Sequence, residues 1–157
     1  MQFDANNTIV KLCAEGMMLE GEGKKEEASK LFQRAWDEAT DDFERFIAAH
    51  YLARLQENVT AKLRWDEIAL HLALKINDDG VEGAFPSLYL NVGKCYEDLR
   101  DMENAAKNYQ LALSFVDMLP DNGYGRMIKG GVLDGIERTR NITQIPSIPD
   151  VNRGDKQ

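Results

Sequence analysis

A spacing of small and large side chains limits the folds that this chain can adopt. Gly93 is followed twelve positions later by Ala105, and Tyr109 and Ala112 follow at intervals of four and three. Such intervals place residues on one face of an α-helix. Small residues on two successive helices let them cross closely, and a large ring fills the space beside them. The segment therefore predicts a pair of packed helices.

A second copy of this spacing lies near the start of the chain. Gly16 precedes Ala28 by twelve positions, and Phe32 and Ala35 continue the pattern at the same intervals as before. Neither helix of such a pair can bury its apolar face alone, so neighbouring pairs are expected to stack on one another.

A third, less regular copy lies between these two. Ala49 takes the place of the glycine, thirty-three positions after Gly16 and forty-four before Gly93, and the copy continues with Ala61, Trp65 and Ile68. The extra residues that follow it include Asn77-Asp78-Asp79-Gly80, a polar run that predicts a loop added between repeats.

The three copies resemble the tetratricopeptide repeat, whose pattern has a large residue, Leu-Gly and Tyr on a first helix and Ala, Phe and Ala on a second. Over residues 9–140 the resemblance implies an all-α fold, a right-handed α-solenoid of three helix pairs plus a C-terminal capping helix. Residues 1–142 would form this domain. Residues 143–157, with two prolines and a polar end, are expected to be an extended or flexible tail. The expected helices are 5–20, 24–39, 42–57, 60–77, 86–99, 102–118 and 124–140.

A glycine-rich stretch, DNGYGRMIKGG at residues 121–131, raises the alternative of a phosphate-binding loop. Its spacing fits neither G-x-x-x-x-G-K-[ST] nor G-x-G-x-x-G, and no strand is expected before it. We interpret it as the start of the capping helix, with Gly130 and Gly131 allowing close approach to the third pair. The alternative is a small-ligand sensor or enzyme whose pocket beside this helix holds an anion through Arg126 and Lys129.

The composition argues against several classes of function. A net charge of −8 and a pI near 4.8 oppose binding to nucleic acid. The first thirty residues lack a basic start followed by an apolar run, and no uncharged stretch is long enough to span a bilayer, which predicts a cytoplasmic protein without membrane attachment.

Few residues in the chain suit catalysis or metal binding. The chain has two histidines, His50 and His71, and two cysteines, Cys13 and Cys95, without a CxxC pair. No nucleophile, base and orienting acid occur together. We therefore expect no metal, no cofactor and no enzymatic activity.

The resemblance also implies where a partner would bind. In tetratricopeptide proteins the first helices of successive pairs line a concave groove that holds an extended peptide or a partner helix. By register, this groove would include Phe46, His50, Arg54, Asn91 and Lys94, with Arg126 and Lys129 extending it from the capping helix. The leading hypothesis is an adaptor or scaffold that binds a peptide or protein in this groove. Assembly with copies of itself is a further possibility.

Overall fold

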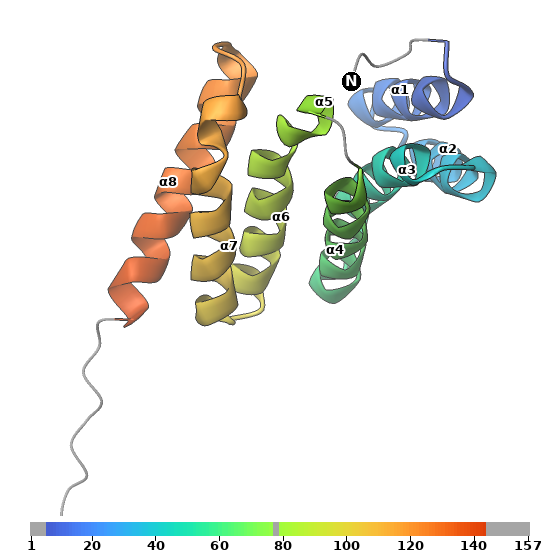
Figure 1. Cartoon of the computed structure of the whole chain (residues 1–157). Helices are drawn as coiled ribbons and strands as arrows, with labels where there is room; N and C mark the ends of the chain where they lie inside the picture. The colour runs from blue at the N-terminus through green and yellow to red at the C-terminus, as the bar shows by residue number, and fades with distance from the viewer. Residues whose placement is uncertain (1–5, 77–78, 144–157) are drawn as a thin grey trace, which may run out of the picture.

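The computed structural model describes residues 6–76 and 79–143, and within these ranges the chain is helical, with no strand (Figure 1). The elements are α1 (Thr8–Gly21), α2 (Lys25–Glu38), α3 (Asp42–Arg54), α4 (Val59–Lys75), α5 (Asp79–Glu82), α6 (Phe85–Asp98), α7 (Met102–Ser114), the 3-10 helix η1 (Val116–Met118) and α8 (Gly123–Thr143). The all-α fold class and each of the long helices predicted from the sequence are confirmed. The right-handed sense of the solenoid stays a prediction.

The pattern of contacts divides the helices into successive pairs. α1 packs against α2, α3 against α4 and α6 against α7, and α8 lies against α7 and α6, as a capping helix should. The pairs connect to one another through α2 and α3 and through α4 and α6. The division predicted from the repeated spacing is therefore confirmed.

Two details of the predicted connections differ from the structure. The predicted loop at 77–80 is in part a short helix, because Asp79 and Gly80 belong to α5, while residues 77 and 78 lie outside the described residues. The helix predicted to continue to residue 118 ends at Ser114, and η1 follows it. The predicted tail lies outside the described residues except for Thr143, which ends α8.

Side chains cap the helices at the starts that the sequence indicates. An Asp41 carboxylate oxygen accepts a hydrogen bond from the Glu44 N–H at 2.8 Å, and Asp101 accepts one from the Asn104 N–H at 3.1 Å. Glu44 in turn accepts a bond from the Thr40 N–H at 2.8 Å, one residue before the cap. These bonds satisfy N–H groups that a helix start leaves without partners.

The small residues of the repeat lie where two helices meet. A Cβ added to Gly16 would stand 2.3 Å from the Phe32 ring, and one added to Gly93 would stand 2.9 Å from the Tyr109 ring. Phe32 and Tyr109 are fully buried. The two glycines are therefore needed for the close crossing that their spacing predicted.

Two glycines of α8 lie at close contacts with neighbouring helices, and the sequence predicted only one of them correctly. A Cβ on Gly131 would meet the Leu90 side chain at 3.1 Å, which agrees with the predicted close approach to α6. The same prediction for Gly130 is wrong, because Gly130 faces open space. The closest approach is at Gly135, where a Cβ would stand 2.6 Å from the Tyr109 ring. Gly135 lies one helical turn beyond Gly131, so it is Gly135 that lets α8 lie close to α7.

Candidate functional site

Three residues of the predicted groove lie on α3 and differ in how accessible they are. Phe46 belongs to the core, with 6% of its surface exposed. The His50 ring lies edge-on to Tyr51, with centroids 5.4 Å apart, and its Nδ1 is buried without a hydrogen-bond partner in the described part of the chain. Burial lowers the pKa of His50, so the ring is neutral near pH 7. Arg54 is exposed and forms an ion pair with Glu20 of α1 at 3.2 Å.

Two further groove residues lie on α6. Asn91 is half-buried, and Lys94 is exposed and bonds to Asp98, one turn further along the helix, at 2.5 Å. The Lys94 ammonium also lies 4.0 Å from Glu97. Its charge is therefore balanced by carboxylates of its own helix.

The last two predicted site residues, Arg126 and Lys129, lie on α8. Arg126 forms an ion pair with Asp121 at 3.1 Å, and Lys129 is exposed. α8 meets α6 through Gly131, which approaches Leu90. At about 100° of rotation per residue, Arg126 and Lys129 point roughly 140° and 160° away from Gly131. By this helix geometry the two cations point away from the side of α8 that meets α6, and their part in the groove stays a prediction.

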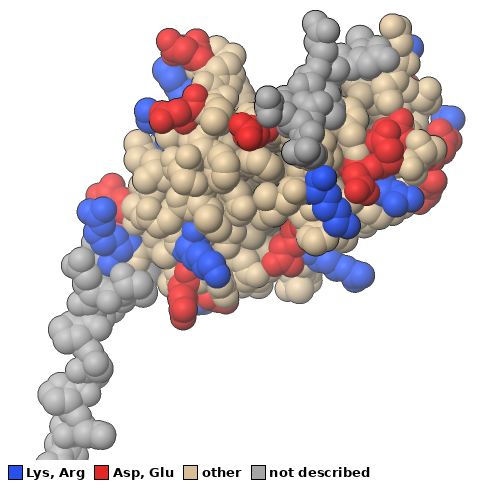
Figure 2. Space-filling model, viewed as in Figure 1, with Lys and Arg blue, Asp and Glu red and all other residues tan. Residues whose placement is uncertain are grey.

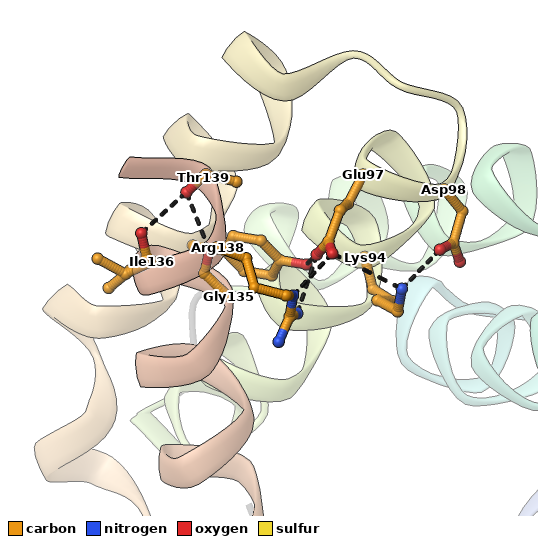
Figure 3. A network of polar contacts seen from close by, with 8 residues as sticks. Lys94, Glu97, Asp98, Gly135, Ile136, Arg138 and Thr139 are labelled. Atoms are coloured by element: carbon orange, nitrogen blue, oxygen red, sulfur yellow. Dashed lines mark hydrogen bonds and ion pairs between the residues drawn. The ribbon is translucent and has the colours of Figure 1, made fainter. Parts of the chain in front are cut away.

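A polar network that sequence reasoning missed connects α6, α7 and α8 (Figure 3). Arg138 donates to both carboxylate oxygens of Glu97, at 2.7 and 2.9 Å, and the Tyr109 hydroxyl donates to the same carboxylate. The Arg138 hydrogen bond lowers the pKa of Glu97 to about 2, against the effect of its burial, with help from Tyr109 and Lys94. The carboxylate is therefore ionised and fully bonded, which suits a structural clamp rather than a general base.

One comparison with known proteins identifies the fold of this region. Residues 86–115, which span α6 and α7, match the family model of the tetratricopeptide repeat. The chain contains a tetratricopeptide repeat. No curated protein and no solved structure matches the chain.

The tetratricopeptide repeat at α6–α7 meets the preceding pair through a buried polar cluster. Asp66 of α4 is 1% exposed, and its Oδ2 accepts a bond from the Lys62 ammonium at 2.5 Å and a weak one from the Cys95 thiol of α6 at 3.5 Å. Its Oδ1 is buried with no partner among the described residues. A buried carboxylate with one unsatisfied oxygen lowers the free energy of unfolding. The contact between α4 and α6 is therefore polar, and Asp66 is only partly hydrogen-bonded in it.

The two thiols of the chain, Cys13 on α1 and Cys95 on α6, are not activated for nucleophilic chemistry. Burial raises the pKa of Cys13 to about 12 and that of Cys95 to about 11. Both therefore remain protonated at neutral pH. In residues 6–76 and 79–143, no group of three His, Cys, Asp or Glu side chains is placed to hold a metal ion. Over the same ranges, no helix combines the length and apolar character that crossing a membrane requires.

The glycine-rich corner before α8 has a structural explanation. The Asn122 side chain accepts a hydrogen bond from the Gly125 N–H at 3.0 Å and so caps α8. A Cβ on Gly125 would stand 2.0 Å from the Pro120 carbonyl oxygen, which excludes any larger residue. Since Asp121 also pairs with Arg126, both the Gly125 N–H and the Arg126 cation have partners within the chain.

Charged side chains are mixed on the visible surface rather than gathered by sign. Figure 2 shows Lys and Arg interspersed with Asp and Glu, and a broad uncharged area where α6, α7 and α8 lie in the same view as Figure 1. This surface offers no continuous basic stripe of the kind that nucleic acid binding requires.

Proposed function

We propose that this chain is a non-catalytic adaptor that binds a peptide segment of a protein partner along the face formed by the first helices of its pairs, α1, α3 and α6. The match of residues 86–115 to the tetratricopeptide repeat is the observation that supports this function, because such repeats generally bind proteins. The structure adds two further pairs of the same kind before it.

Exposure selects the residues that would touch the partner. Cys13, Phe46 and Ser87 are buried between helices and are therefore not available to contact a partner. Met17 is 42% exposed at one end of the face, and Lys94 is exposed at the other.

The proposed contact residues share a position on a first helix and a side chain that reaches solvent at least in part. They are Met17, His50, Arg54, Asn91 and Lys94. An apolar end with Met17 and a polar end with Asn91 and Lys94 would fix the direction of a bound peptide. Arg126 and Lys129 lie outside this proposal because α8 turns them away from α6.

The absence of catalysis in this proposal is supported by the state of the reactive groups. Both thiols are protonated, Glu97 is bonded to Arg138, and the His50 Nδ1 has no acid or nucleophile bonded to it among the described residues. No general acid–base pair is thus assembled within this part of the chain.

The experiment is affinity capture from the native lysate with quantitative mass spectrometry. Wild type is compared with Met17→Ala/Asn91→Ala/Lys94→Ala, whose side chains all reach solvent, and with Met18→Ala/Gln110→Ala/Lys30→Ala, a matched variant in exposed residues elsewhere. The proposal expects at least one partner whose recovery falls about tenfold or more with the first variant only. Equal recovery of every partner by all three proteins would overturn it.

A further inference from the structure

A hollow of ≈ 650 Å³ lies along the second helices of the first two pairs, away from the face discussed above. Its walls come from the end of α2, the start of α3 and the middle of α4. The residues that matter for its chemistry are Trp36, Arg45, Arg64, Glu67, Ile68 and His71. None of them belongs to the proposed contact residues on the first helices.

The hollow continues in both directions along α4. Trp36, Arg64 and Ile68 also line a neighbouring hollow of ≈ 950 Å³ that reaches the start of α4 at Asn58. On the other side, Glu67 and His71 also line a hollow of ≈ 420 Å³ between α4, α6 and α7. A row of adjoining hollows suits an extended chain better than a compact small molecule.

Two indole rings form an aromatic platform at the junction of the first two hollows. Trp36 and Trp65 pack edge to face, with ring centroids 5.0 Å apart and planes at 83°. Both rings are only partly buried. Partly exposed tryptophans beside a hollow are the residues that most often contribute binding energy when a partner covers them.

Two arginines from different helices border the hollow without partners. Arg45 of α3 and Arg64 of α4 are exposed, and neither has an ion pair or hydrogen bond within residues 6–76 and 79–143. The two carboxylates of the hollow are bound by neutral donors instead. Asp37 accepts from the Gln33 amide at 2.9 Å, and Glu67 accepts from the Tyr96 hydroxyl at 2.7 Å.

Two arginines beside an aromatic surface are suited to bind a carboxylate. A guanidinium binds a carboxylate through two parallel hydrogen bonds, and it does so best beside low-dielectric aromatic surface. Asp37 and Glu67 also line the hollow, but neither forms an ion pair with Arg45 or Arg64 in the described part of the chain, so both guanidiniums are open to an external carboxylate.

We propose that this hollow is a second binding site, which takes an acidic peptide segment with an aromatic or large aliphatic side chain next to a carboxylate. The carboxylate lies between Arg45 and Arg64, and the apolar side chain lies against Trp36 and Ile68. The flanking residues of the peptide follow α4 through the neighbouring hollows. The site would let the chain contact two partners, or two segments of one partner, on opposite helices of the same pairs.

Tryptophan emission reports directly on this site, because Trp36 and Trp65 are the two tryptophans of the whole chain. The probe is the peptide acetyl-Asp-Leu-Glu-Phe-Asp-Leu-Glu-amide, which contains no tryptophan. Its matched control replaces each Asp by Asn and each Glu by Gln. Titration of the full chain should give a saturable change in emission with the acidic probe, and binding at least tenfold weaker with the control peptide.

Variants of equal charge assign the binding to the two arginines. Arg45→Gln/Arg64→Gln should weaken probe binding at least tenfold, whereas Arg126→Gln/Lys129→Gln, which also removes two positive charges, should leave it unchanged. All four side chains are exposed, and circular dichroism checks that the helices are retained. Absence of a saturable change in wild type, equal binding of both peptides, or equal loss in both variants would overturn the proposal. None of these outcomes bears on the capture experiment, because the two faces share no residue.

Discussion

The two junctions between successive helix pairs differ in the side chains that form them. At the first, Phe32 of α2 stacks on Tyr51 of α3, with centroids 5.3 Å apart, and Trp36 packs edge-on to Trp65. At the second, α4 meets α6 around buried Asp66 and its partner Lys62.

The buried apolar residues at the second junction belong to two separate clusters. A small cluster of Leu63, Val92 and Cys95 lies apart from the main core, which contacts the junction at its other end. The first helices α1 and α3 touch across the first junction, and α3 makes no comparably extensive contact with α6.

This difference matters because the stability of a helical repeat is close to a sum of contacts between neighbours. Aromatic packing is favourable once water is excluded, whereas a buried ion pair gains little after its desolvation. We therefore expect the second junction to contribute less to folding and to open first. The repeat matched at residues 86–115 then acts with α8 as one unit, and the first two pairs act as another.

The largest expected effect comes from Phe32, which packs beside Gly16 within the first pair and on Tyr51 across the first junction. Phe32→Ala removes a fully buried ring that fills the space beside Gly16, and should lower the free energy of unfolding by about 3–5 kcal/mol. Leu63→Ala in the small cluster of the second junction should cost about 2–3 kcal/mol. Urea denaturation measures both, and a larger loss for the Leu63 variant would contradict the comparison.

Two variants test the ion pair of Lys62 and Asp66 at the second junction, one that removes the cation and one that removes both charges. Lys62→Met leaves the Asp66 carboxylate buried without its cation and should cost about 3 kcal/mol. Lys62→Met/Asp66→Leu replaces both charges by apolar groups and should recover most of that loss, as chemical denaturation would show. If the double variant were less stable than Lys62→Met, the ion pair would be a net stabiliser and the junction stronger than we infer.

A pair of glycine variants tests the third contact, between α7 and α8. Gly135→Ala places a methyl group 2.6 Å from the Tyr109 ring and should cost about 2 kcal/mol. Gly130→Ala, in open space on the same helix, should stabilise by about 0.5–1 kcal/mol because alanine favours the helix. Thermal unfolding distinguishes the two, and a similar shift for both would show that α8 does not lie as close to α7 as described.

The clamp between α6 and α8 predicts a specific dependence on pH. Arg138 lowers the pKa of Glu97 from its ordinary value of 4.5 to about 2, so the unfolded chain binds the proton more readily. The stability from this group is complete above about pH 4.5 and is lost as the pH falls toward 2.

The amount lost is about 1–2 kcal/mol, because solvent reaches Arg138. In Glu97→Gln this part of the acid dependence should be absent when unfolding is followed by circular dichroism. A variant and a wild type that lose stability in parallel between pH 4.5 and 2 would show that the clamp contributes nothing.

Local spacing predicted the helices and their pairing, because small and large residues at helical intervals encode which faces meet. The same logic found Gly131 but placed the second close approach at Gly130 instead of Gly135. Adjacent glycines give no sign of which one faces the core. In the structure Gly131 approaches Leu90, and Gly135 approaches Tyr109.

The residues of the candidate sites could be predicted less well from local spacing. The ion pair of Lys94 with Asp98 joins residues four positions apart and could have been foreseen. Glu97 and Arg138 are forty-one positions apart, and the platform of Trp36 and Trp65 joins two helix pairs. No interval in the sequence relates such partners, because they meet only after the pairs have stacked.

Native-state hydrogen exchange tests the difference between the two junctions most directly. The amides of α1 to α4 should share one free energy of opening and those of α6 to α8 another, with the boundary between α4 and α6. A single free energy of opening from α1 to α8, or a boundary between α2 and α3, would contradict the inference that the polar junction is the weaker one.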